Sequence, residues 1–274
     1  MEHQQNCNLK QAFPFVKWVG GKRSIIRALL SSLPPVFQDY YEPFVGGGAM
    51  FFALQRQVNK AYLSDINRDL ITAYQVVQSQ PQELITKLTQ YHQEHSRERY
   101  YRVRLLDSCD ESVEVAARFL YLNKTCYNGL YRVNKEGKFN VPMGKYGQVK
   151  VDYKNIMACH NVLADANISV CNFDRISPKK GDLVYFDPPY HFEERKTFVD
   201  YSNSGFTSQH QRQLKEFFDD LSQQGVHLML SNSNTDMIKK LYSNYNIKVV
   251  MAPRHISCRS DQRVAVTELL VTNY

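Results

Sequence analysis

The 274-residue chain is 43% hydrophobic and 22% charged, and its formal net charge is +7. The length fits one large domain or one domain with a sizeable insertion, and the apolar content suffices for a packed core. No apolar run approaches the roughly 18 to 20 residues that cross a bilayer, and the polar start lacks a signal-peptide pattern, so we expect a cytoplasmic protein.

The first part of the chain, up to about residue 66, has an α/β pattern. Apolar spacing and breaker residues predict a helix, a strand, a helix and a strand, over residues 24–33, 39–43, 49–57 and 60–63. From there to about residue 165 the periodicity is mainly helical, over residues 70–77, 82–95 and 113–122. A glycine-rich, aromatic stretch over 128–147 predicts a hairpin and loop.

The last part of the chain returns to alternating strands and helices. Strands are predicted over residues 168–170, 183–186, 227–231, 248–251 and 268–272, with helices over 209–223 and 236–245. This alternation predicts an α/β fold with a mostly parallel sheet covered on both faces. The helical middle is then an insertion, which gives one domain of residues 1–66 plus 167–274 and another of residues 67–166.

The segment Asp187-Pro188-Pro189-Tyr190 directly follows a predicted buried strand. In open α/β sheets, ligands bind just beyond the carboxyl ends of strands. The Asp187 carboxylate and the Pro188 carbonyl, aimed by the rigid Pro-Pro step, offer two acceptors for the N–H groups of a planar amine. That arrangement frees the nitrogen lone pair to attack a sulfonium methyl group in line, while Tyr190 can stack on a flipped base. Such a tetrapeptide is also ordinary turn chemistry, but its position favours catalysis.

A glycine-rich turn, Gly46-Gly47-Gly48, lies between a predicted strand and a helix. Glycine lets the backbone approach a cofactor closely. The pattern is not G-x-G-x-x-G, because position 51 is Phe, which argues against a dinucleotide dehydrogenase. Asp65, nineteen residues after Gly46, can accept the ribose hydroxyls of a nucleoside cofactor. Asp65 or Asn67 could equally cap the next helix.

The chain's single Trp, Trp18, precedes Gly20-Gly21-Lys22 at the start of a predicted helix. The spacing differs from that of an ATP-binding phosphate loop. Lys22 could instead meet the carboxylate of a methionine moiety, assisted by backbone N–H groups at the helix terminus. Trp18 could also be a simple core residue.

Basic residues gather between residues 97 and 154, where twelve Lys and Arg outnumber seven Asp and Glu, with tyrosines interleaved. Cations and flat rings suit a nucleic-acid surface, although a solvated helical face explains the composition equally well. The six cysteines are scattered and lack C-x-x-C spacing, so we expect reduced structural thiols and no metal site.

Together these motifs resemble the Dam-type, alpha-class DNA adenine-N6 methyltransferases, over nearly the whole chain from Phe15 to Tyr274. Further matches lie at residues 127–132, 139–142 and 230–232. The resemblance is greatest to the GATC modification methylases of type II restriction-modification systems. It implies a Rossmann-like, S-adenosyl-L-methionine-dependent methyltransferase sheet (residues 1–66 plus 167–274, catalytic and cofactor-binding) with an inserted, mainly helical target-recognition domain (residues 67–166) that carries a β-hairpin.

The resemblance also implies a role for each matching residue. The catalytic set is Asp187, Pro188, Pro189 and Tyr190. The set that contacts S-adenosyl-L-methionine is Trp18, Lys22, Phe44, Val45, Gly46, Gly47, Asp65, Phe173 and Asp187. The set that contacts DNA is Lys17, Tyr127, Asn128, Leu130, Arg132 and Pro142.

Within the DNA set, Tyr127 and Asn128 are expected to wedge into the double helix beside a flipped adenine. Arg132 and Lys17 are expected to contact guanines of the family's GATC target, Arg132 through a bidentate pair. Leu130 and Pro142 are expected to pack on bases.

Some segments and alternatives stay open at this point. Residues 191–204 receive no role, and Arg254, Arg259 and Arg263 could bind phosphates or lie on an ordinary solvated hairpin. The same chemistry would serve cytosine N4, an RNA adenine or a protein glutamine, although Asp187 and the basic insertion favour adenine in DNA. A DNA-binding relative without catalysis is disfavoured because every motif is retained. We expect a monomer acting on double-stranded DNA.

Overall fold

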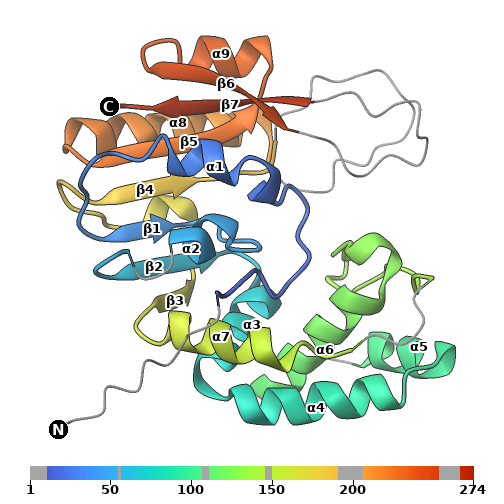
Figure 1. Cartoon of the computed structure of the whole chain (residues 1–274). Coiled ribbons are helices and arrows are strands. Elements are labelled where there is room, and N and C mark those ends of the chain that lie inside the picture. Colours follow the sequence, from blue (N-terminus) through green and yellow to red (C-terminus); the bar gives the residue numbers. More distant parts are fainter. Residues whose placement is uncertain (1–10, 55–56, 107–110, 146–149, 191–205, 253–265) are drawn as a thin grey trace, which may run out of the picture. The chain divides into compact units, whose positions relative to one another are not determined.

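A computed structural model of the chain describes residues 11–54, 57–106, 111–145, 150–190, 206–252 and 266–274. The chain divides into two compact units (Figure 1). The sheet unit comprises Gly20–Ile66 and Asn167–Tyr274, and the helical unit comprises Met1–Val19 and Asn67–Ala166.

The start of the chain is grouped differently from the prediction. Residues 11–19 lie with the helical unit, whereas the prediction placed them with the sheet. Two contacts explain this grouping. The backbone of Lys17 is hydrogen-bonded to Asn123, and the Trp18 ring packs on Phe119 and Tyr131.

The sheet unit contains a seven-stranded sheet in the order β3-β2-β1-β4-β5-β7-β6. Strands β1 to β5 pair in parallel, and β7 pairs antiparallel with both β5 and β6. The strands are β1 (Tyr40–Glu42), β2 (Ala61–Asp65), β3 (Asn167–Val170), β4 (Leu183–Phe186), β5 (His227–Ser233), β6 (Asn246–Ala252) and β7 (Val266–Thr272). The predicted α/β class and all seven strands are therefore confirmed.

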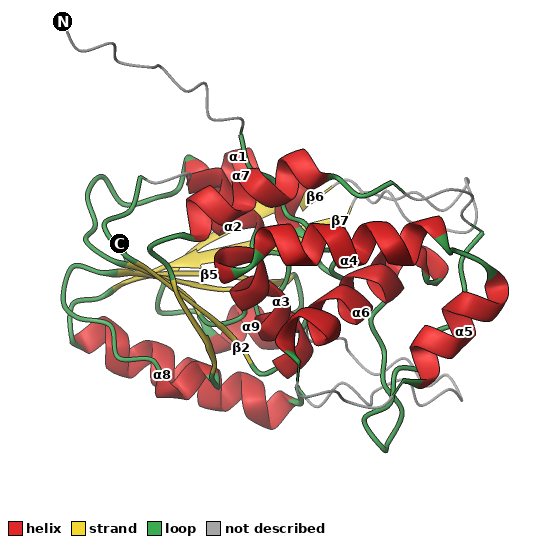
Figure 2. Ribbon diagram, turned by 90° about the horizontal axis from the view of Figure 1, so that it is seen from below, coloured by secondary structure: helices red, strands yellow, loops and turns green. Residues whose placement is uncertain are grey.

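Helices cover the sheet on both faces, as the continuous apolar strands require. Figure 2 shows α8 (Ser208–Gln223) on one face and α1 (Ile26–Leu30) and α2 (Ala49–Leu54) on the other. Val184 and Phe186 of β4 pack in one buried cluster with Leu214 and Phe218 of α8. Successive strand residues alternate between faces, so residue 185 points to the side of α1 and α2. A short helix, η1 (Lys22–Ser24), precedes α1, and α9 (Asp236–Leu241) follows β5.

The helical unit is built from α3 (Arg68–Ser79), α4 (Pro81–Gln93), α5 (Arg97–Leu105), α6 (Ser112–Thr125) and α7 (Tyr153–Leu163). Of the two candidate caps, Asn67 caps α3 by accepting the Leu70 N–H at 3.0 Å. After α6 the chain forms η2 (Tyr127–Gly129) and a hairpin. Antiparallel bridges join Cys126 to Met143 and Val133 to Phe139, as the 128–147 prediction requires.

Two helices, α5 and α7, were not predicted, and α5 shows why. Its sequence, RERYYRVRL, has five charged residues and only Tyr100 and Val103 are buried, so its apolar stripe is too narrow to be recognised from periodicity. No helix in the ranges described above is both long and apolar enough to cross a membrane.

Candidate active site and nucleic-acid interface

The carboxyl edge of the sheet gathers acidic groups from four strands. Glu42 ends β1, Asp65 ends β2, and Asp187 directly follows β4. Glu268 reaches the same edge from the other direction, because β7 runs antiparallel and pairs Glu268 with Ser233 at the end of β5. Sequence reasoning missed Glu268, since only the reversed direction of β7 places the start of that strand at this edge.

Lys22 holds the centre of a charged cluster with Asp187, Glu268 and Tyr190. Its ammonium lies 2.8 Å from Asp187 Oδ1 and 3.9 Å from Glu268 Oε2, and it donates to the Gly20 carbonyl at 2.7 Å. The Lys22 side chain is only 3% exposed, whereas that of Asp187 is 20% exposed. The cluster is thus a desolvated ion pair with one carboxylate still open to a ligand.

The Tyr190 side chain is held at its hydroxyl and at its ring. The hydroxyl donates to Glu268 Oε2 at 2.5 Å, and the ring centroid lies 4.6 Å from the Lys22 ammonium. A cation at this distance from an aromatic face is attracted by the ring quadrupole. The structure therefore joins the end of the motif to both the η1 lysine and the β7 carboxylate.

The surroundings of Asp187 raise the pKa of its carboxyl. Burial raises the pKa of its carboxyl, the nearby Lys22 ammonium lowers it, and the Glu268 carboxylate raises it again, to a net value of about 6. At neutral pH the group is mainly ionised, and it loses its charge as the pH falls through about 6. Asp187 can therefore serve as a hydrogen-bond acceptor under physiological conditions.

Glu42 is the second perturbed carboxyl at this edge, and it is 3% exposed. Its Oε2 accepts from the Tyr40 hydroxyl at 2.8 Å and from the Phe51 N–H at 3.1 Å. Burial raises its pKa to about 8, against the lowering effect of these bonds, so the group is largely protonated at neutral pH. Glu42 thus links β1 to α2 from a buried position.

The glycine turn after β1 is pinned to β2. Val45 N–H donates to the Ser64 carbonyl at 3.0 Å, and Gly46 N–H donates to Asp65 Oδ2 at 3.2 Å. Gly46 has φ 45°, a conformation that side-chain-bearing residues rarely adopt. Beside the turn, Phe44 stacks on buried Phe173 with a centroid distance of 5.5 Å. A carboxylate, a glycine backbone without side chains and two aromatic rings thus lie together.

Of the predicted cofactor-contacting residues, all but one belong to the sheet unit: Lys22, Phe44, Val45, Gly46, Gly47, Asp65, Phe173 and Asp187. Trp18 belongs to the helical unit, where its ring stacks on Tyr131 at 5.7 Å and tilts against Phe119 at 6.3 Å. Trp18 is half-buried, and within its own unit its ring is packed against these two aromatic side chains.

The predicted DNA-contacting residues all lie in the helical unit. Buried Asn123 of α6 joins distant parts of this set. It accepts from the Lys17 N–H and donates to the Lys17 carbonyl, both at 2.8 Å, and it also donates to the Gly129 carbonyl at 3.3 Å. A Cβ on Gly129 would overlap the Lys17 side chain, so the two segments are in close contact. Sequence reasoning missed Asn123.

The hairpin presents most of its predicted contact residues to solvent. Tyr127, Asn128, Arg132 and Pro142 are exposed, and Leu130 is half-buried. The Tyr127 N–H donates to the Pro142 carbonyl at 2.9 Å, and Asn128 has φ 55°, in the left-handed region. A tight turn thus displays these side chains on one exposed segment.

Arg132 is oriented by Asn140, which lies in the 139–142 match but was given no role from the sequence. Arg132 Nε donates to Asn140 Oδ1 at 2.7 Å, and the Asn140 N–H donates to the Arg132 carbonyl at 3.1 Å. Because Nε is engaged, the outer edge of the guanidinium, with its two Nη groups, faces away from this bond. That edge is the one that forms bidentate pairs with guanine.

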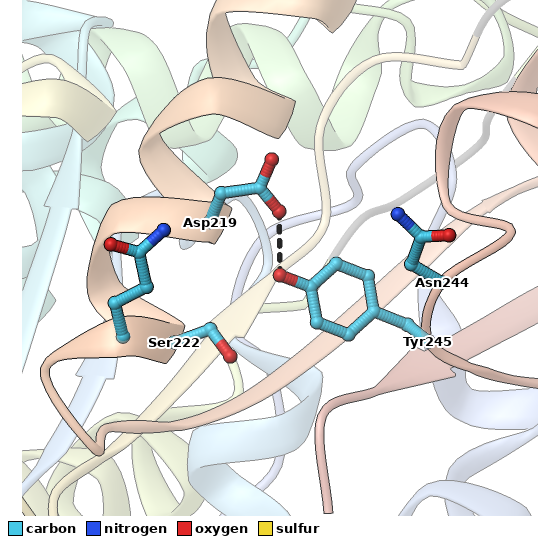
Figure 3. Close-up of a pocket in the computed structure, with 5 residues that line it drawn as sticks. Asp219, Ser222, Asn244 and Tyr245 are labelled. Atoms are coloured by element: carbon cyan, nitrogen blue, oxygen red, sulfur yellow. Dashed lines mark hydrogen bonds between the residues drawn. The ribbon is translucent and has the colours of Figure 1, made fainter.

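A polar hollow of about 500 Å³ lies elsewhere on the sheet unit (Figure 3). It is lined by Asp219, Ser222, Gln223, Asn244 and Tyr245, and the Tyr245 hydroxyl donates to Asp219 at 2.5 Å. These residues precede the amino ends of β5 and β6, so the hollow is at the opposite edge of the sheet from Asp187. It takes no part in the candidate site. Among the described residues, no group of three or more His, Cys, Asp or Glu is placed to hold a metal ion.

The parallel sheet, its glycine turn and the Asp187–Tyr190 segment at the carboxyl edge define an α/β methyltransferase. A family model described as D12 class N6 adenine-specific DNA methyltransferase matches residues 18–256, and the chain belongs to that family. It is thus an enzyme that methylates adenine in DNA.

Named relatives match over nearly their full lengths. Type II methyltransferase M.MjaIII of Methanocaldococcus jannaschii is 40% identical, over 95% of this chain and 99% of the relative. Type II methyltransferase M1.LlaDCHI of Lactococcus lactis subsp. cremoris is 38% identical, over 95% of each. A DNA adenine methylase of Vibrio cholerae is 30% identical, over 96% of each.

Proposed function

We propose that this DNA adenine methyltransferase transfers the methyl group of S-adenosyl-L-methionine to N6 of a flipped adenine in GATC. The observation that carries the chemical part of the proposal is the cluster at the carboxyl edge, where Asp187 and Tyr190 meet Lys22 and Glu268. We further propose that it acts as a monomer in the cytoplasm, on double-stranded DNA.

The residues at the glycine turn fit the proposed cofactor. Asp65, at the end of β2, offers a carboxylate to ribose hydroxyls, and Phe44 and Phe173 offer aromatic surface to the adenine ring. Gly46 and Gly47 lack side chains that would hold a ligand away from the backbone. When bound, the cofactor supplies an activated methyl group. We assign to Lys22 and Trp18 further contacts with it.

Asp187 and Pro188 are proposed to accept the two N–H groups of the adenine amine. This removes the lone pair from conjugation with the ring and lets nitrogen attack the methyl carbon in line. The N–CH3 bond forms as the S–CH3 bond breaks to leave a thioether, and the nitrogen then loses one proton. The ionised form of Asp187 is required, and its pKa of about 6 keeps it available at neutral pH. Tyr190 is proposed to stack on the flipped base, which must leave the DNA stack to reach the site. Lys22 limits the affinity of Asp187 for a proton.

The exposed hairpin is proposed to select GATC. Arg132, oriented by Asn140, presents the edge that pairs with guanine O6 and N7, a contact worth about 1 to 3 kcal/mol of discrimination. Lys17, close to Gly129 of the hairpin, is assigned to the first guanine. Tyr127 and Asn128 are proposed to fill the space left by the adenine, and Leu130 and Pro142 to pack on bases.

A protection assay tests the reaction and the site together. Plasmid incubated with enzyme and S-adenosyl-L-methionine is challenged with three GATC nucleases, which are respectively blocked by, dependent on and indifferent to adenine methylation. Resistance to the first and new sensitivity to the second support the proposal. Methyl transfer to DNA with unchanged cleavage at GATC would preserve the chemistry and reject the proposed target.

A further inference from the structure

Two buried amide side chains, one from α8 and one from β5, are linked by hydrogen bonds to the Asp187–Tyr190 motif. Both lie on the face of the sheet that α8 covers. Gln211, in the first turn of α8, and Asn232, near the end of β5, both have 0% exposure. Asn232 continues the row of Leu228 and Leu230, which pack towards α8, whereas Asp187 follows Tyr185 on the other face. Burying an amide costs free energy unless its polar atoms are hydrogen-bonded, so the partners of this pair are informative.

The hydrogen bonds of the pair form a chain with one direction. The Ser233 N–H donates to Asn232 Oδ1 at 2.8 Å, Asn232 Nδ2 donates to Gln211 Oε1 at 3.0 Å, and Gln211 Nε2 donates to the Pro189 carbonyl at 3.1 Å. A backbone N–H can only donate and a carbonyl can only accept. The two ends of the chain therefore fix the orientation of both amides.

The Pro189 carbonyl is a natural point at which to hold the motif. Pro188 and Pro189 have no N–H, so neither can anchor its backbone by donating a hydrogen bond. The Pro189 carbonyl belongs to the peptide group that leads into Tyr190, and its direction sets where the Tyr190 side chain leaves the backbone. Glu268 then holds the far end of the same side chain at its hydroxyl.

We propose that Gln211, supported by Asn232, is a positioning residue for methyl transfer. By holding the Pro189 carbonyl, it fixes Asp187 and Tyr190 in the geometry that the target amine requires. The inference rests on the proposed role of the Asp187–Tyr190 segment in binding the flipped adenine. Gln211 contacts neither base nor cofactor in this scheme and acts only through the backbone of the motif.

The first test replaces Gln211 with methionine, which keeps the side-chain length but removes the donor and the acceptor. The matched control is Gln213→Met, on the exposed side of the same helix. We expect kcat of Gln211→Met to fall by about 10 to 100-fold, as small misplacements in active sites do, with the cofactor Kd within about twofold of wild type. When 2-aminopurine replaces the target adenine, its fluorescence should rise on binding to the wild-type enzyme, because the base leaves the stack. Gln211→Met should lose this rise.

Gln211→Glu supplies a signature that a merely structural role would not. A protonated glutamic acid can donate to Pro189 and accept from Asn232, whereas the ionised form can only accept. Burial raises the pKa of such a carboxyl. The kcat of the variant relative to wild type should therefore be near one at about pH 6 and fall by about tenfold towards pH 8.5, measured where circular dichroism shows both proteins folded.

The outcomes separate the possibilities. A kcat ratio for Gln211→Glu that does not change with pH overturns the inference, and so does a folded Gln211→Met enzyme with wild-type kcat. If Gln211→Met does not fold, the pH dependence of Gln211→Glu decides alone. Failure of the underlying proposal is distinct, because Asp187→Asn and Tyr190→Ala would then retain wild-type turnover whatever the Gln211 variants do.

Discussion

Replacing Lys22 with methionine removes the ammonium that lies 2.8 Å from the Asp187 carboxylate. At an effective dielectric constant of about 20, two unit charges at this distance attract by about 6 kcal/mol, and breaking buried pairs costs about 3 to 5 kcal/mol in practice. In the variant, burial and Glu268 raise the pKa of Asp187 without the opposing effect of Lys22. If the ionised form of Asp187 loses about 3 kcal/mol of stabilisation, the pKa of its carboxyl rises by about two pH units.

The assay is kcat against pH, from about pH 5.5 to about pH 9.5, at saturating DNA and cofactor. Wild-type activity should fall as the pH drops through about 6, because Asp187 then gains a proton. The Lys22→Met profile should fall about two pH units higher and recover partly in alkaline buffer. Arg27→Met, which removes a charge from an exposed position of α1, should keep the wild-type profile. Coincident acid limbs for Lys22→Met and wild type would refute this electrostatic reasoning.

Three further predictions concern Glu268, Asn123 and Glu42. Glu268→Gln removes a charge that raises the pKa of Asp187, so the acid limb of kcat should move to lower pH, and an upward shift would contradict this. Asn123→Leu removes the buried amide that bonds both backbone groups of Lys17, so denaturant unfolding should show a loss of about 2 to 4 kcal/mol together with weaker DNA binding; unchanged values would contradict it. Glu42, with a pKa of about 8, binds its proton more tightly when folded, so wild-type stability should fall by up to about 1.4 kcal/mol per pH unit from about pH 4.5 to about 8. Calorimetry of Glu42→Gln should show a stability that changes less with pH than that of the wild type. Equal pH dependence in the two proteins would exclude Glu42 as the cause.

The class of fold was predictable because strands and helices in this chain carry regular patterns. The strand over 183–186 matches β4, and its four buried residues explain why a short apolar run sufficed. Helix α5 could not be found in this way, since its charged surface leaves little periodicity. The grouping of residues 11–19 with the helical unit depends on contacts to Asn123, Phe119 and Tyr131, which lie more than 100 residues away.

The candidate site was predictable where its residues form contiguous motifs, as Asp187–Tyr190 and the glycine turn do. Glu268, Gln211 and Asn140 were given no role from the sequence, because each acts through a partner that only the folded chain brings near. Glu268 in particular required knowledge that β7 is antiparallel to β5. The segment 191–204 and three arginines noted in the sequence lie outside the described residues: Arg254, Arg259 and Arg263.

The central claim is that Asp187 directs methyl transfer to adenine N6 in GATC. The most direct measurement is the transfer of tritiated methyl from S-adenosyl-L-methionine to a duplex with one GATC site, followed by nucleoside analysis. We expect N6-methyladenine as the labelled product, no label in a duplex lacking GATC, and no transfer by a folded Asp187→Ala enzyme. Label in another nucleoside, or near-normal transfer by Asp187→Ala, would contradict it.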